Sequence, residues 1–137
     1  MSATPAAPYP RLHEGFFALF GGPIAWFLHL CAGYALANEP CWRAGQRIAH
    51  SPLALEGSRA GIAGATIAAV LVALGATSLS WRAYKKAREA ASAHGGVDPA
   101  VGRAAFLSLW GVILGGGSAV AASLTAIALN ILPRCGG

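Results

Sequence analysis

The sequence predicts an all-α, polytopic membrane protein with three transmembrane helices. Of its 137 residues 55% are hydrophobic and only 11% are charged, whereas about a quarter of the residues in a soluble domain are charged. The apolar residues are collected into three uncharged runs, each longer than the roughly 20 residues that a helix needs to cross a bilayer. None of these runs alternates polar and apolar residues, so a membrane β-barrel is excluded. We therefore expect a single membrane domain, residues 1–137.

The three runs place the helices at about residues 15–38, 60–83 and 104–132. The first contains Gly21, Gly22 and Pro23, and we expect a kink there because Pro23 lacks a backbone donor. The second run is followed by the charged residues 82–93, which are interpreted as a helical extension. Trp81 closes the second helix at the depth of the lipid headgroups, where amphipathic rings are enriched.

The charges predict the orientation of the chain. Three crossings place the N-terminus and the second loop on one side of the membrane, and the first loop and the C-terminus on the other. The first side carries Arg11, Arg82, Lys85, Lys86, Arg88 and Arg103, and the second carries Arg43, Arg47, Arg59 and Arg134. Because basic residues concentrate on the cytoplasmic side, we predict a cytoplasmic N-terminus in a bacterial inner membrane. The basic residues indicate contacts with lipids and no nucleic acid, for which the chain has no motif.

Two of the three cysteines are predicted to lie on one side of the membrane. Between Cys41 and Cys135 the chain crosses twice, and the charge bias makes their side periplasmic. Oxidising conditions there preserve disulfides, so we predict a Cys41–Cys135 disulfide, the alternative being two unpaired thiols. The bridge would close a loop of about 95 residues, worth on the order of 4 to 5 kcal/mol in chain entropy. Cys31, inside the first helix, is interpreted as a buried core residue.

Ionisable residues inside the three runs would indicate a function. No Asp, Glu, Lys or Arg occurs there, which argues against a proton relay or an ion-coupled transporter. His29 is the exception, and with Ala25 it is similar to the Ala-x-x-x-His pattern by which light-harvesting polypeptides hold bacteriochlorophyll. We expect no cofactor, but haem or bacteriochlorophyll on His29 is the alternative. Without a ligand, His29 is expected to be neutral and hydrogen-bonded to a carbonyl or a partner helix.

Catalytic motifs are absent from the sequence. It contains no zinc-protease helix, nucleophile elbow, phosphate-binding loop or Cys-x-x-Cys pair. The chain is therefore predicted not to be an enzyme, although it can belong to a complex that is one.

Small residues indicate helix packing, since alanine and glycine together make up more than a third of the chain. The predicted packing residues are Gly61, Gly64, Ala65, Gly111 and Gly115, spaced three or four apart on their helices. Small faces on more than one side of a helix exceed the need of a three-helix bundle, so we expect a larger membrane partner. The alternative is that alanine simply fills positions that face lipid.

Four short segments carry a resemblance to a known group of proteins: Gly-Pro-Ile-Ala-Trp-Phe-Leu-His-Leu at residues 22–30, Tyr-Ala-Leu at 34–36, Cys41, and Pro-Arg-Cys at 133–135. In these segments the chain resembles small proteobacterial membrane proteins often encoded near cytochrome c oxidases. The resemblance implies an accessory or assembly subunit of a haem-copper oxidase and carries over no functional residues. Our leading hypothesis is thus a non-catalytic subunit of a respiratory or electron-transfer complex. The alternatives are a pigment- or haem-binding subunit that uses His29, and a small transporter or pore.

Overall fold

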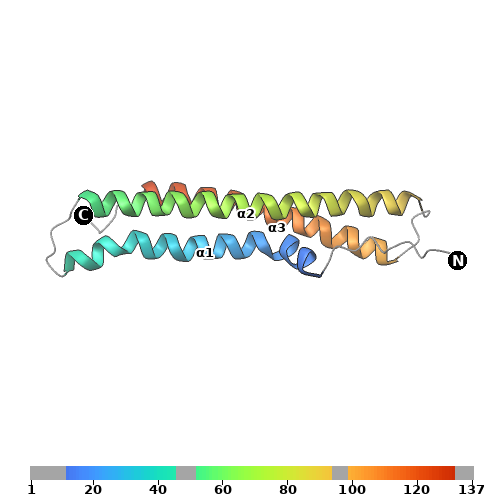
Figure 1. Ribbon diagram of the computed structural model, residues 1–137, viewed down its shortest axis with the longest axis horizontal. Helices are drawn as coiled ribbons and strands as arrows, with labels where there is room; N and C mark the ends of the chain where they lie inside the picture. The colour runs from blue at the N-terminus through green and yellow to red at the C-terminus, as the bar shows by residue number, and fades with distance from the viewer. Residues whose placement is uncertain (1–11, 46–51, 94–98, 132–137) are drawn as a thin grey trace.

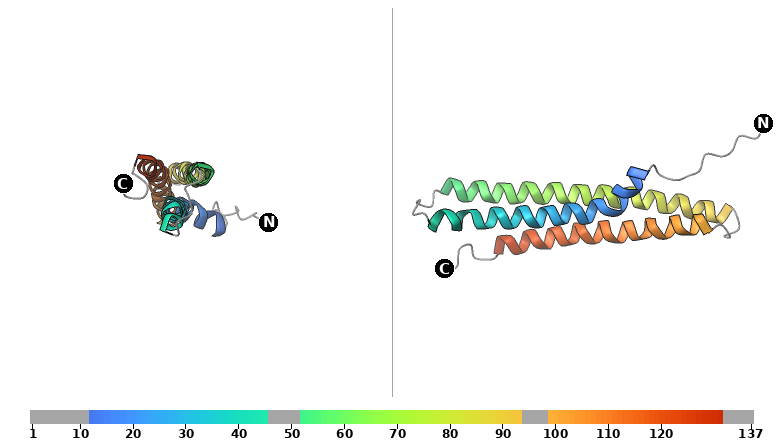
Figure 2. Two further views of the ribbon diagram at one scale, coloured as in Figure 1. Left: turned by 90° about the vertical axis from the view of Figure 1, so that its left-hand side faces the viewer. Right: turned by 90° about the horizontal axis from the view of Figure 1, so that it is seen from below.

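The structure, a computed structural model, describes residues 12–45, 52–93 and 99–131, all of them in three α-helices. The helices are α1 (Leu12–Gly45), α2 (Pro52–Ala93) and α3 (Pro99–Ile131). In Figure 1, α2 runs antiparallel to α1 and α3. Each helix packs against both of the others, and the end view in Figure 2 shows them as the corners of a triangle.

All three helices are long and apolar enough to span a membrane, over His13–Asn38, Gly57–Ala93 and Pro99–Ile131. The described residues contain no strand. The predicted fold class, an all-helical chain with three membrane-spanning helices, is therefore confirmed.

The helices continue beyond the apolar runs. With 42 residues, α2 is roughly 63 Å long, about twice the thickness of the hydrocarbon core. The helical extension predicted for residues 82–93 is confirmed, because α2 ends at Ala93 and Ala, Lys, Arg and Glu are good helix formers. α1 runs on to Gly45 and α2 begins at Pro52, the first helical position, where proline is favoured.

The core of the bundle consists of small side chains. Its buried members are almost all Ala, Gly or Ser, and Ile62 and His29 are the large exceptions among the described residues. The large apolar side chains lie outside, including Phe16, Phe27 and Phe106, each more than half exposed. In water this arrangement would expose a large apolar surface. In a bilayer it lets the helix backbones approach closely and gives the large side chains to the lipid.

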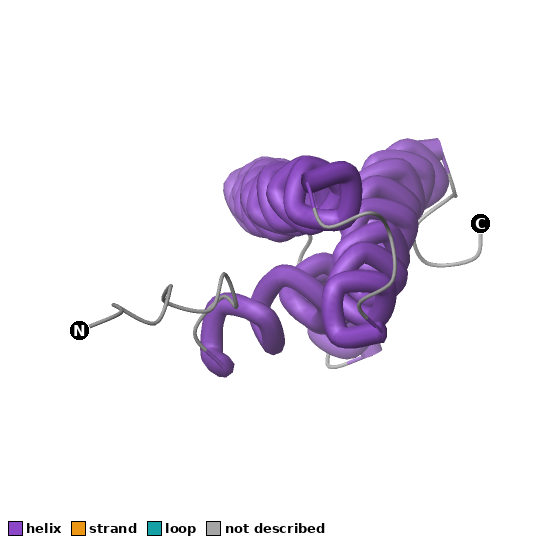
Figure 3. Tube along the Cα trace, turned by 90° about the vertical axis from the view of Figure 1, so that its right-hand side faces the viewer, coloured by secondary structure: helices purple, strands orange, loops and turns teal. Residues whose placement is uncertain are grey.

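The first turns of α1 bend away from the bundle. Figure 2 (right) shows this end of the helix, coloured blue, leaving α2 and α3, and Figure 3 shows the same bend near the N-terminus. Pro23 has no N–H to donate to the carbonyl of Leu19, one turn earlier, and Gly21 and Gly22 ease the bend. The bend lies at the position where the sequence predicts a kink.

Candidate functional site

His29 lies at the interface between α1 and α2 and is only 2% exposed. Its Nε2 is 2.9 Å from Oγ1 of Thr66 on α2. The Thr66 hydroxyl has one proton, which it donates to the carbonyl of Ile62 at 2.7 Å. Thr66 must therefore accept from His29, so the imidazole carries a proton on Nε2. The two residues join α1 to α2 in the middle of the apolar region.

Two buried polar atoms near this hydrogen bond have no partner among the residues that the structure describes. They are Nδ1 of His29 and Nε1 of Trp26, which lie three residues apart on α1. In the neutral imidazole Nδ1 is an acceptor, because Nε2 holds the proton, whereas the indole N–H is a donor. Both atoms are enclosed by apolar surroundings, and an unpaired buried group of this kind costs on the order of 1 to 3 kcal/mol.

The environment of His29 does not fit an axial ligand of a tetrapyrrole. Its Nε2 is occupied by Thr66, and the ring is enclosed between two helices with almost no exposed surface. A flat macrocycle would require both the Thr66 bond and the contact between α1 and α2 to open. The arrangement matches the other expectation, a histidine that is hydrogen-bonded to a neighbouring helix.

Two serines on α2 bond to carbonyl oxygens of α1 near its prolines. Ser58 donates to the carbonyl of Leu36 at 2.8 Å, which is the carbonyl that Pro40, four residues later, cannot serve. Ser80 donates to the carbonyl of Ala18 at 2.9 Å, next to the one that Pro23 leaves without a donor. These buried hydroxyls satisfy or strengthen the weakest parts of the α1 backbone and connect it to α2.

Three of the five predicted packing residues lie in helix contacts. A Cβ on Gly61 would come 3.1 Å from Leu36, one on Gly111 would collide with the Ser80 hydroxyl, and one on Gly115 would collide with the Thr77 hydroxyl. Gly64 lies outside the contacts among the three helices, because it is exposed and has nothing within 4 Å of an added Cβ. Its side of α2 faces away from both other helices. Ala65 is half-buried.

The α1–α3 crossing contains a close contact between two glycines. A Cβ added to Gly22 would lie 2.8 Å from the Cα of Gly115 and 3.3 Å from the Cβ of Ser118. Small residues at this spacing let two helix backbones touch. Gly22 belongs to the segment that carries the resemblance given above, and the structure assigns it a packing role.

The cysteine predictions have different outcomes. Cys31 is exposed and unpaired, so the interpretation as a buried core residue is wrong: its position on α1 points away from the other helices. Cys41 lies within α1, but its side chain is outside the described residues, as is all of Cys135. The predicted Cys41–Cys135 disulfide therefore stays a prediction.

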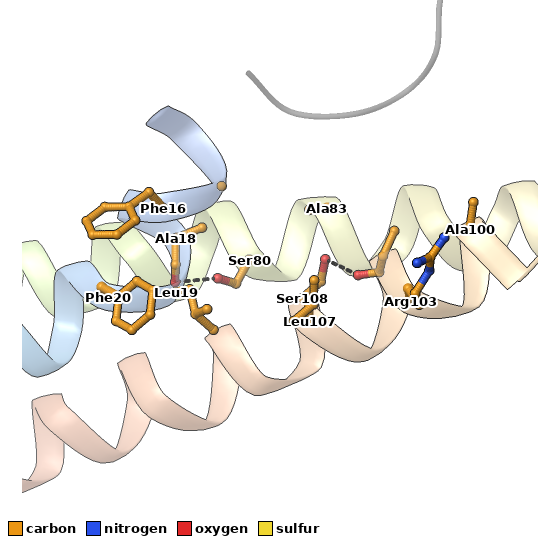
Figure 4. Close-up of a pocket in the computed structure, with 12 residues that line it drawn as sticks. Phe16, Ala18, Leu19, Phe20, Ser80, Ala83, Ala100, Arg103, Leu107 and Ser108 are labelled. Atoms are coloured by element: carbon orange, nitrogen blue, oxygen red, sulfur yellow. Dashed lines mark hydrogen bonds between the residues drawn. The ribbon is translucent and has the colours of Figure 1, made fainter. Parts of the chain in front are cut away.

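A groove of about 660 Å³ opens where the first turns of α1 diverge. Figure 4 shows it between the start of α1 and the start of α3, with α2 behind it. Its walls are apolar apart from Ser80, Ser108 and Arg103. Within residues 12–45, 52–93 and 99–131, no three His, Cys, Asp or Glu side chains gather in a way that could hold a metal ion.

Comparison with known proteins gives no matching family, no matching curated protein and no matching solved structure.

Sequence reasoning identified His29 but missed its partner and the groove. Thr66, Ser58 and Ser80 are ordinary helix residues until the register between α1 and α2 is known, since Ser and Thr often bond only within their own helix. Their signal is their position: Thr66 and Ser80 are hydroxyls within the second apolar run and Ser58 lies just before it, each at the level of a histidine or a proline of α1. Arg103 had been counted only as a topology charge.

Proposed function

We propose that this chain is a non-catalytic accessory or assembly subunit that packs in the membrane against a larger respiratory or electron-transfer complex, with a haem-copper terminal oxidase as the partner. The proposal includes a bacterial inner membrane location, a cytoplasmic N-terminus and a periplasmic Cys41–Cys135 disulfide. The resemblance of residues 22–36 to proteins encoded near cytochrome c oxidases supports the choice of partner. The excess of basic residues on the N-terminal side supports the orientation.

The observation that carries the proposal is an outward-facing row of small residues on α2. This row, here called the α2 outer stripe, consists of Ala60, Gly64, Ala68, Gly75 and Ser78, all exposed. One large side chain, Leu71, lies on the same face between Ala68 and Gly75 and is 64% exposed. Added Cβ atoms at Gly64 and Gly75 would meet nothing within 4 Å. Inside the bundle, small residues occupy the close contacts of α3 with α1 and α2, at Gly22, Gly111 and Gly115. Apart from Leu71, the stripe has the composition of such a contact, and no helix of the described residues packs upon it.

The described residues also argue for a scaffold on chemical grounds. The polar side chains buried in the bundle are His29 and three serines. His29 and two of the serines form hydrogen bonds between α1 and α2. None of the four is a carboxylate or ammonium group, which proton relays and ion-coupled carriers require. No specific contact favours the pigment-binding or transporter alternatives.

Purification of the tagged chain from its native membranes in mild detergent tests the proposal. We expect it to migrate with a complex that carries the haem absorbance of a terminal oxidase. A chain that migrates only as a lone monomer, with no oxidase and no other large membrane complex, would overturn the proposal.

Variants of the stripe make the test specific. Gly64→Leu and Gly75→Leu place large side chains on the stripe without touching the rest of the bundle, so we expect a folded chain that no longer co-purifies with the complex. Gly117→Leu is the matched control, because Gly117 on α3 is also exposed and has nothing within 4 Å. Equal loss of the complex in all three variants would show that the stripe is not the contact.

A further inference from the structure

The groove at the start of α1 and α3 has a shape that follows from the bend in α1. Pro23 and the two preceding glycines let the first turns of α1 separate from the bundle, as Figure 2 shows. One wall of the groove lies on those turns of α1 and consists of Gly15, Phe16, Leu19 and Phe20. The other wall lies on α3, from Ala100 to Ser108. From Ala100 to Ser108 the helix rises by eight residues, or about 12 Å. The groove therefore follows the direction of α3 for more than two helical turns.

The hydroxyl groups inside the groove have no free proton to donate to a polar ligand. The Ser80 hydroxyl donates to the carbonyl of Ala18 at 2.9 Å, and the Ser108 hydroxyl donates to the carbonyl of Ala104 at 2.7 Å. Figure 4 shows both bonds, the first between α2 and α1 and the second within α3. The remaining lining is Phe, Leu, Ala and Gly, apart from Arg103. Such a surface suits a hydrocarbon chain.

Arg103 gives one end of the groove a positive charge. It is exposed, and it has neither a salt bridge nor an aromatic ring contact among the described residues. It lies one turn after the start of α3 at Pro99, where the helix dipole also favours an anion. By contrast, Lys85 lies over the Trp81 ring and Arg88 over the Tyr84 ring, at 5.6 and 5.9 Å from the ring centres.

The surrounding charge has the same sign. The described basic residues at this end of the bundle are Arg82, Lys85, Lys86, Arg88 and Arg103, against the acidic residues Glu14 and Glu89. Glu14 lies 4.0 Å from His13 on the same turn of α1. An anionic group at the mouth of the groove would therefore enter a region of positive potential.

We propose that the groove holds an acyl chain of an anionic phospholipid from the surrounding bilayer, with the phosphate of its headgroup bound by Arg103. The chain lies between Phe16 and Phe20 on α1 and Leu107 on α3. The apolar walls are surrounded by the acyl chains of every lipid, so they do not distinguish one headgroup from another. The charge of Arg103 therefore supplies the preference for an anionic over a zwitterionic lipid. One Lys or Arg near the membrane surface contributes a preference of about fivefold.

Native mass spectrometry of the full-length chain, titrated in detergent with phosphatidylglycerol or with phosphatidylcholine of the same acyl chains, tests this site. We expect phosphatidylglycerol to bind about fivefold more tightly, and Arg103→Gln to abolish the difference. Arg82→Gln is the matched control, because Arg82 is a basic residue at the same end of the bundle that does not line the groove. Equal binding of the two lipids, or equal effects of the two substitutions, would overturn the proposal.

Filling the groove tests the acyl-chain part of the site. Ala104→Leu on α3 and Ala83→Leu on α2 are each expected to weaken the binding of both lipids. Circular dichroism is expected to show an unchanged helix content in both variants. Unaltered lipid binding in the two variants would contradict an acyl chain in the groove. Displacement of phosphatidylglycerol by inorganic phosphate alone would instead indicate a free-anion site. A lipid-free dimer that Ala104→Leu dissociates would assign the groove to a second copy of the chain.

Discussion

Substitution of Gly111 by alanine tests how closely the three helices must approach. Gly111 on α3 lies against Ser80 of α2 and the backbone of α1 at the same point. An added Cβ would collide with the Ser80 hydroxyl, and it would lie 3.0 Å from both the Ser80 Cβ and the carbonyl oxygen of Ala18. Carbon atoms in favourable contact are about 3.5 to 4.0 Å apart, so one helix must move or the Ser80 side chain must rotate.

The cost can be worked out from these contacts. Overpacking of a close-packed interior costs about 1 to 3 kcal/mol, and rotation of Ser80 would also lose its bond to Ala18, an interhelical bond worth roughly 0.6 kcal/mol in a membrane. Alanine in place of glycine in a helix interior recovers about 0.5 to 1 kcal/mol. We therefore expect Gly111→Ala to lower the free energy of unfolding by a net value of about 0.6 to 3 kcal/mol. The cause is local, because Ser80 is 1% exposed and has no room to turn outward.

The assay is unfolding of the purified chain by sodium dodecyl sulfate in mixed micelles, followed by a tryptophan or circular dichroism signal. Gly117→Ala is the control on the same helix, where an added Cβ meets nothing within 4 Å. There the substitution is expected to leave stability unchanged or to raise it by up to about 1 kcal/mol, because alanine is the better helix former. If Gly111→Ala is as stable as Gly117→Ala, the close three-helix contact inferred at Ser80 is wrong.

Three further outcomes are expected. Ser58→Ala should lower the free energy of unfolding by about 0.6 to 1.7 kcal/mol, because it removes the donor to the Leu36 carbonyl, which Pro40 cannot serve. Ser78→Ala should be nearly neutral, because the Ser78 hydroxyl bonds only within α2. Equal effects of the two substitutions would show that the bond between helices contributes no more than the bond within one helix. Thr66→Val should destabilise by a similar amount in the same assay, because it leaves Nε2 of the buried histidine unpaired, and an unchanged stability would mean that this bond is not formed. Intact-mass analysis with and without reductant should show a gain of two hydrogens if Cys41 and Cys135 are bridged, and no gain would rule the bridge out.

Much of the fold was predictable because membrane insertion leaves a local record in the chain. A run of uncharged residues long enough to cross the bilayer requires no knowledge of its neighbours, so the three helices follow from composition. The same logic singled out His29, since an imidazole within such a run needs a partner. Gly61, Gly111 and Gly115, which the sequence singled out for packing, lie in contacts between helices.

The errors concern the direction in which residues face. Cys31 was expected inside and is exposed. Gly64, which was expected to pack against a helix, has open space around it within the described bundle, and its packing role stays a prediction. Alanine and glycine occur on every side of these helices, and the lipid-facing side is as apolar as the interior. The periodicity that distinguishes the two sides of a helix in a soluble protein is therefore weak here.

The sequence by itself determined that this protein is a three-helix membrane bundle with small residues for close packing and few buried polar groups, because hydrophobicity, residue size and the missing donor of proline are properties of single residues. Only the tertiary structure decided that His29 bonds to Thr66, Ser58 to Leu36 and Ser80 to Ala18, pairs that lie 37, 22 and 62 positions apart in the chain. It also decided that the bend in α1 opens a groove beside Arg103. Those contacts depend on the register and rotation of whole helices, which are set by the sum of many weak packing interactions across the bundle.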